Sequence, residues 1–117
     1  MTLLPITTID GAGAATITAT GEIDMDTSGD LADAITAALS DPRVTEVVID
    51  LGHVTFLDMV ALGDLLRRRA DALDTGRTLR LTAPRGVVRR VLDISGTYSL
   101  LIGDVSQPVR RVACMAS

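Results

Sequence analysis

Two stretches rich in β-branched and small residues, separated by turn residues, open the chain. The stretches from Leu3 to Ile9 and from Ala15 to Thr20 are rich in Ile, Thr and Ala. Asp10-Gly11-Ala12-Gly13 lies between them, and an Asp-Gly turn flanked by such runs is typical of a β-hairpin. The pattern therefore predicts two antiparallel strands near the N-terminus.

After the hairpin, segments with helical periodicity alternate with short apolar runs. Helical spacing of apolar residues predicts helices from about Ser28 to Leu39, from an N-cap at Asp58 to Gly76, from Pro84 through Leu92, and from Asp104 to Ala116. Short β-branched, apolar or alternating runs predict strands over Val47–Leu51, Thr78–Thr82 and Leu100–Ile102. The first of these three is continuously apolar, which is typical of a central parallel strand covered on both faces.

The order of the expected elements predicts the fold class. Strands that alternate with helices favour right-handed crossovers and parallel pairing, and the initial hairpin adds an antiparallel edge. The sequence thus predicts an α/β fold with a mixed sheet of about five strands and about four helices. Because 117 residues correspond to about one domain, we expect a single domain over residues 1–117.

Charge and composition narrow the functional classes. The net charge is −4 and all eleven cationic side chains are arginines, so nucleic acids and anionic lipids would on average be repelled. Phe56 and Tyr98 are the only aromatic residues, which leaves little for stacking on single-stranded nucleic acid. No stretch approaches the roughly 18 apolar residues of a membrane span, and the single thiol, Cys114, fits a reducing compartment. We expect a cytoplasmic protein that binds no nucleic acid and does not insert into a membrane.

Three groups of residues invite a catalytic or cofactor interpretation, but each has a simpler one. Gly11 to Thr16 begins like a dinucleotide-binding fingerprint, yet Thr16 replaces the third glycine and a strand follows, which favours a hairpin turn. His53 is the single histidine and has no accompanying nucleophile or metal-ligand spacing. The runs Arg67–Arg69 and Arg89–Arg90 have aspartates nearby, as solvated helix faces do. No enzymatic activity, cofactor or metal is expected.

Glu22, Asp24 and Asp26 form an acidic cluster ahead of the first helix. A paired-carboxylate or Mg²⁺ site would need a base, a Gly-rich turn or a second acidic cluster, and the sequence supplies none of these beside it. We therefore interpret the cluster as an acidic rim for a protein partner.

The second helix begins with three apolar residues, Met59, Val60 and Ala61, at a place where polar residues are usual. Two interpretations are open. The three side chains either pack under the edge of the sheet or form a small apolar contact surface.

Several motifs, in the same order along the chain, resemble those of STAS domains, and most closely those of stand-alone bacterial anti-sigma factor antagonists. The similar segments are Gly21-Glu22-Ile23-Asp24 with Thr27, Val47–Leu51, Phe56-Leu57-Asp58 with Leu62-Gly63, and Leu92-Asp93-Ile94-Ser95-Gly96. The resemblance implies a STAS-like fold and, as partner, a cytoplasmic anti-sigma factor that is also a Ser/Thr kinase. Binding by the antagonist would free a sigma factor, and phosphorylation of the first serine in an Asp-Ser-Ser-Gly motif would end the binding.

That switch motif is altered in this chain. Its four positions are Asp58-Met59-Val60-Ala61, so Met59 stands where the family has its phosphoacceptor serine. A thioether has no hydroxyl to receive a phosphoryl group, so the usual off-switch cannot operate at Met59.

The sequence and the resemblance together favour a non-enzymatic regulatory protein that binds an anti-sigma factor and is constitutive or acts as a scaffold. The residues assigned to partner binding are Glu22, Asp24, Thr27, Asp58, Met59, Val60 and Ala61. Two alternatives stay open, because similar domains also respond to nucleotides or lipids or serve as accessory subunits of lipid-transport ATPases. A small-molecule module would need a concave site in place of a flat apolar surface.

Overall fold

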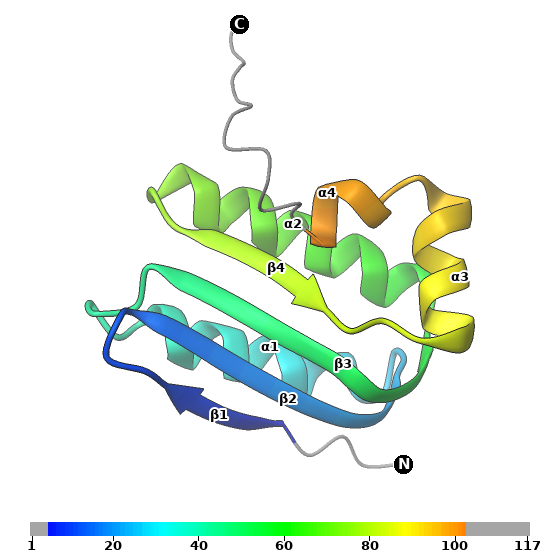
Figure 1. Cartoon of the computed structure of the whole chain (residues 1–117), viewed down its shortest axis with the longest axis horizontal. Helices are drawn as coiled ribbons and strands as arrows, with labels where there is room; N and C mark the ends of the chain where they lie inside the picture. Colours follow the sequence, from blue (N-terminus) through cyan, green and yellow to red (C-terminus); the bar gives the residue numbers. More distant parts are fainter. Residues whose placement is uncertain (1–4, 103–117) are drawn as a thin grey trace, which may run out of the picture.

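The computed structural model describes residues 5–102 and shows helices packed against a four-stranded sheet (Figure 1). The elements are β1 (Ile6–Ile9), β2 (Ala14–Ile23), α1 (Ser28–Leu39), β3 (Glu46–Leu57), α2 (Met59–Asp74), β4 (Thr78–Thr82), α3 (Gly86–Ser95) and α4 (Tyr98–Ile102). The strand order is β1-β2-β3-β4; β1 is antiparallel to β2, whereas β2, β3 and β4 are parallel. The predicted α/β class, parallel centre and antiparallel N-terminal edge are confirmed, with four strands in the described residues where about five were expected.

The glycine-containing stretch at residues 10–13 is the turn of the N-terminal hairpin, as predicted. The Asp10 carboxylate accepts hydrogen bonds from the backbone N–H groups of Ala12 (2.7 Å) and Ala14 (3.0 Å). These bonds, the one from Ala14 above all, hold the pKa of the Asp10 carboxyl below its ordinary value. Gly13 has a φ of 94°, and a Cβ there would lie 2.9 Å from the Arg43 carbonyl oxygen. The turn therefore requires a glycine at this position.

The core lies between the sheet and the helices on one of its faces (Figure 1). β2 and β3 contribute alternate apolar residues, and α1 and α2 face them with residues at helical spacing. The largest fully buried side chains are Ile17, Ile23, Leu31, Ile35, Ile49, Leu51, Leu57, Leu62, Leu65, Leu81 and Leu92. All are aliphatic, so the scaffold that supports the strand ends is built without aromatic packing.

The opposite face of β3 is only half-covered, so the expectation of a strand covered on both faces is wrong within the described residues. Glu46 and Asp50 on that face are half-buried, and Val48 between them is 8% exposed. In the register of the sheet, Val48 lies between Thr16 of β2 and Arg80 of β4. Arg80 also pairs with Glu46 at 3.0 Å, so its side chain extends across the face. Within residues 5–102, the neighbouring strands shield this apolar residue.

The prediction of a strand over Leu100–Ile102 is wrong, because these residues form the second half of α4. The N–H of Leu101 donates to the Thr97 carbonyl at 2.9 Å, and Leu101 is fully buried while Leu100 is 46% exposed. Tyr98, Leu101 and Ile102 pack on the core at the i, i+3, i+4 spacing of a helix. A run of three apolar residues does not distinguish a strand from a helix.

The helix expected over residues 104–116 and the thiol of Cys114 lie outside the described residues.

Three arginines of the charged runs on the helices, Arg67, Arg68 and Arg89, are paired with nearby carboxylates. Asp64 accepts hydrogen bonds from both Arg67 and Arg68, the latter at 2.8 Å, and Arg89 lies 3.5 Å from Asp93. These pairs are one helical turn apart and partly exposed, as expected for solvated helix faces. Among the helices of residues 5–102, none has the length and apolar character needed to cross a bilayer.

Candidate functional site

β3 is far longer than the strand predicted from its apolar run, and two irregularities reset its side-chain alternation. The register with β2 shifts between Thr18 and Thr20, and again between Gly21 and Glu22, with the extra residues on β3. Such bulges bend a strand and re-aim its side chains. As a result Leu51, Val54 and Leu57 are buried in the core, whereas His53 and Phe56 point outward. His53, expected in a loop, is therefore an exposed residue of the strand.

The carboxyl ends of the parallel strands β2 and β3 lie side by side (Figure 1). Glu22 is opposite Phe56 and Ile23 is opposite Leu57 in the register. One more backbone bond, from the N–H of Asp58 to the Ile23 carbonyl at 3.0 Å, extends the pairing to the first residue after β3. The acidic loop and the start of α2 are thereby held together at one end of the sheet, although they are more than thirty residues apart in the chain.

Thr27 organises the loop from its interior. Its hydroxyl donates to the Glu22 carbonyl at 2.6 Å and accepts from the Asp24 N–H at 3.0 Å. The Asp24 carboxylate in turn accepts from the N–H groups of Asp26 (2.9 Å) and Thr27 (3.1 Å). Thr27 is only 1% exposed, so its side chain is not available to touch a partner directly. It acts by holding Glu22 and Asp24 in place.

Removing the Thr27 hydroxyl is expected to loosen this loop. Thr27→Val keeps the shape of the side chain but leaves the Glu22 carbonyl and the Asp24 N–H without their partner, at a cost of about 1 to 3 kcal/mol. Equilibrium denaturant unfolding measures the loss, and Thr27→Ser, which retains the hydroxyl, serves as the matched control. A Thr27→Val variant as stable as the native protein would show that the hydroxyl bonds do not hold the loop.

The three apolar residues at the start of α2 have different surroundings. Asp58 is the N-cap, as predicted, and its carboxylate accepts from the N–H of Ala61 at 2.7 Å. Ala61 is 2% exposed and packs into the core, whereas Met59 and Val60 are 61% and 66% exposed. Ala61 thus packs inside, whereas Met59 and Val60 face solvent, where the second interpretation requires them to be.

Exposed apolar side chains from three segments surround this end of the sheet. Met25 in the acidic loop is 73% exposed and Phe56 at the end of β3 is 40% exposed, in addition to Met59 and Val60. We refer to these four residues, together with Glu22, Asp24 and Asp26, as the loop–helix surface. Met25 and Phe56 were not among the residues assigned from the sequence. In the sequence, Met25 lies between two aspartates and Phe56 lies beside a bulge of β3. Only the register between β2 and β3 shows that both belong to the same end of the sheet.

The chain was compared with known protein families and solved structures. Residues 7–102 match the family model described as "Mlab, STAS domain". The chain is similar in structure to the anti-sigma factor antagonist SpoIIAA in its unphosphorylated form, with a TM-score of 0.69, 21% identity, and coverage of 81% of this chain and 83% of that chain. It is also similar to an anti-sigma factor antagonist from Mycobacterium paratuberculosis, with a TM-score of 0.67, 26% identity, and coverage of 85% and 82%.

A third solved structure, the Bacillus cell-fate determinant SpoIIAA in its phosphorylated form, matches with a TM-score of 0.64 and 19% identity, over 84% of this chain and 87% of that chain. The three matches cover most of both chains, so the similarity extends over most of the fold. Because the family model matches most of its residues, the chain belongs to the STAS domain family.

Proposed function

We propose that this chain is a regulatory protein that binds an anti-sigma factor through the loop–helix surface and thereby releases a sigma factor. The observation that carries the proposal is the exposure of Met59 and Val60 at the start of α2, at the same end of the sheet as the exposed Met25 and Phe56. Large apolar side chains that gather on a protein surface and are flanked by polar groups typically mark an interaction site. The similarity to two anti-sigma factor antagonists supports the choice of partner.

The composition of the loop–helix surface specifies the chemistry of the partner. Glu22 and Asp24 are half-buried and Asp26 is exposed, so carboxylates lie next to the exposed apolar residues. An apolar centre with a charged rim matches the anatomy of protein interfaces, in which the centre contributes affinity and the rim contributes orientation and association rate. The matching face of the anti-sigma factor has an apolar contact area beside lysine or arginine residues.

The absence of a hydroxyl at residue 59 makes the binding constitutive in this proposal. Asp58 keeps its place as the cap of α2, so the backbone of the switch segment is formed, but Met59 offers no oxygen to a kinase. The antagonist then stays competent for binding whether or not its partner is an active kinase.

Isothermal titration calorimetry tests the proposal. The purified chain is titrated against purified kinase-type anti-sigma factors of the same organism. A saturable complex that displaces the sigma factor from one of them is the expected result. The ATPase subunit of a lipid transporter is titrated in parallel. Binding to that subunit, with none to any anti-sigma factor, would overturn the proposal in favour of the transporter alternative.

Neutralising the acidic rim is expected to slow association with the partner. Glu22→Gln combined with Asp24→Asn removes two charges while the Asn side chain keeps the oxygen that accepts from the loop N–H groups. Because charges on a rim steer encounter, the association rate should fall at low salt and depend less on ionic strength. Stopped-flow measurements check this, with Asp71→Asn plus Asp74→Asn at the far end of α2 as the charge-matched control. A native association rate that is the same at low and high salt would exclude steering.

A further inference from the structure

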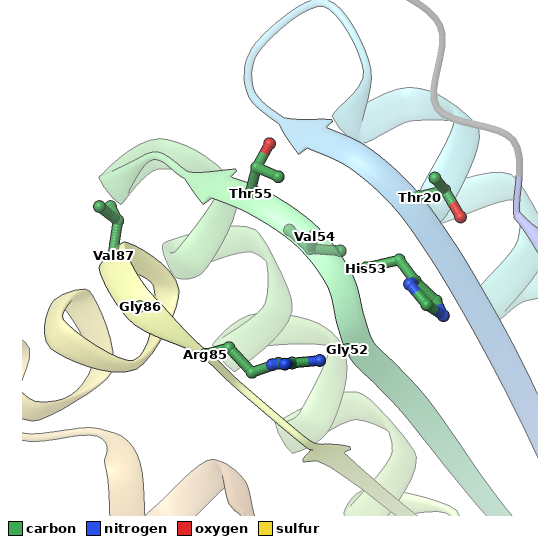
Figure 2. A pocket seen from close by; sticks show the side chains of 8 residues that line it. All are labelled: Thr20, Gly52, His53, Val54, Thr55, Arg85, Gly86 and Val87. Atoms are coloured by element: carbon green, nitrogen blue, oxygen red, sulfur yellow. The ribbon is translucent and has the colours of Figure 1, made fainter.

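An open groove with a volume of about 540 Å³ lies beside the loop–helix surface, between the end of the sheet and the start of α3. Its walls come from three elements: Thr20 of β2, the segment 52–55 of β3, and residues 85–87 at the beginning of α3 (Figure 2). Grooves and pockets that hold small ligands have volumes of about 300 to 1,000 Å³. This groove is thus a concave site of sufficient size, separate from the apolar surface to which the proposed partner binds.

The groove exists because of local features of the backbone. The first bulge of β3 leaves Gly52 at its floor, where a Cβ atom would lie 3.1 Å from an Asp50 carboxylate oxygen and 3.8 Å from the Ala83 Cβ. Ala83 has a φ of 56°, a conformation that costs a non-glycine residue roughly 1 kcal/mol or more. The chain turns there between β4 and α3 and brings Arg85 alongside β3.

Two basic side chains flank the floor of this groove. Figure 2 shows Arg85 on one side of β3 and His53 on the other, with Gly52 between them. Both side chains are exposed, and within residues 5–102 Arg85 makes no ion pair. Arg69, Arg77 and Arg90 also make none there, but of these four arginines only Arg85 lines the groove. The nearby Asp50 carboxylate accepts from the Gly52 N–H at 2.8 Å and is held against the backbone. In a chain with a net charge of −4, an unpaired arginine and the single histidine at one groove favour an anionic ligand.

We propose that this groove binds a small organic phosphate. A guanidinium matches phosphate oxygens with two parallel hydrogen bonds, and His53 and the Thr20 hydroxyl add donors from two other directions. A tetrahedral phosphate carries oxygens on several sides, so it can accept hydrogen bonds from more than one of the groups that line the groove, whereas a planar carboxylate offers two oxygens in one plane. Val87, which is 53% exposed, provides an apolar wall for the body of the ligand. The groove includes Thr55, next to Phe56, so an occupant lies beside the loop–helix surface and is placed to alter partner binding.

Titration of the isotope-labelled chain, followed by the NMR shifts of its backbone amides, tests the assignment. The probes are inorganic phosphate, glycerol 3-phosphate, and phosphatidylcholine vesicles with and without phosphatidic acid, which separate a free phosphate, a soluble organic phosphate and a lipid headgroup. We expect saturable shifts at Gly52, His53 and Val87, with a Kd for glycerol 3-phosphate below about 1 mM. Arg85→Gln should weaken that binding about tenfold or more, because it removes a charge-assisted pair of hydrogen bonds.

Arg90→Gln is the matched control, since Arg90 is an exposed arginine of α3, the helix that follows Arg85, and does not line the groove. His53→Gln should weaken binding to a lesser degree than Arg85→Gln. Binding only to vesicles that contain phosphatidic acid would support the site and assign its ligand to a lipid headgroup. The assignment is overturned if no probe gives saturable shifts up to roughly 10 mM, or if Arg85→Gln and Arg90→Gln bind equally well.

Discussion

Val60→Asp is expected to weaken binding to the anti-sigma factor by about 1 to 3 kcal/mol, which is roughly a 5- to 150-fold rise in Kd. The Val60 side chain is 66% exposed in the free chain and becomes buried in the proposed complex, where a carboxylate would lose its water without gaining a partner. The fold should not suffer, because a negative charge in the first turn of a helix interacts favourably with the helix dipole. Calorimetric titration against the partner measures the change.

Two further variants separate the interface from general effects of the substitution. Val60→Thr keeps the shape and should cause a smaller loss, whereas Leu73→Asp places the same charge on an exposed apolar position at the other end of α2 and should leave Kd unchanged. Val60→Asp that binds as tightly as the native chain, with unaltered unfolding free energy, would remove Val60 from the interface.

Incubation with the partner kinase and ATP is expected to leave the native chain unphosphorylated and to add about one phosphate to Met59→Ser. Residue 59 is the first residue of α2 and its side chain is 61% exposed, so a serine there would be accessible to the kinase. Phosphoryl transfer needs the hydroxyl nearly in line with the γ-phosphate, and a displacement of about 1 Å costs about a hundredfold in rate. The phosphorylated variant should lose partner binding, since a dianion then replaces an apolar side chain at the centre of the surface.

Intact-protein mass spectrometry counts the phosphates on each variant, and peptide mapping shows which residue carries them. Thr27, Ser28 and Thr55 are the nearby hydroxyl residues, and burial of Thr27 at 1% exposure leaves Ser28 and Thr55 as the accessible ones. Stoichiometric phosphorylation of the native chain at either residue, with loss of binding, would contradict a constitutive antagonist. Met59→Ala, which also lacks a hydroxyl, is the control for the substitution itself.

The N-terminal hairpin, α1 and the start of α2 could be predicted, because in these segments the structure that the local sequence favours is also the one that the fold requires. The hairpin, the helix over Ser28–Leu39 and the N-cap at Asp58 follow from turn residues, periodicity and capping, which depend on neighbours in the chain. The full length of β3, residues 46–57, could not be predicted in this way. Two bulges interrupt the alternation of its side chains, and the sequence alone does not indicate where a strand gains an extra residue. The strand was therefore expected to end at Leu51, and His53 was expected in a loop.

Only part of the candidate site could be predicted from the sequence. Met59 and Val60 could be assigned from their place at the start of a helix, but Met25 and Phe56 join them only through the pairing of β2 with β3. Thr27 was assigned to partner binding from the resemblance, but its side chain is only 1% exposed. Its burial follows from the Glu22 carbonyl and the Asp24 N–H, two backbone groups that the loop turns toward it. The sequence around Arg85 does not indicate that it lines one groove with His53, because the two residues are brought there by different elements.

Hydrogen exchange of the chain, alone and in complex with the anti-sigma factor, tests most directly whether partner binding uses the loop–helix surface. Mass spectrometry follows the peptides that contain residues 22–28 and 56–62, and compares them with a peptide over residues 70–78 at the far end of α2. The proposed interface predicts slower exchange in the first two segments and no change in the third, because burial against a partner restricts the opening of backbone hydrogen bonds. A complex in which residues 22–28 and 56–62 exchange as fast as in the free chain, with protection elsewhere, would contradict it.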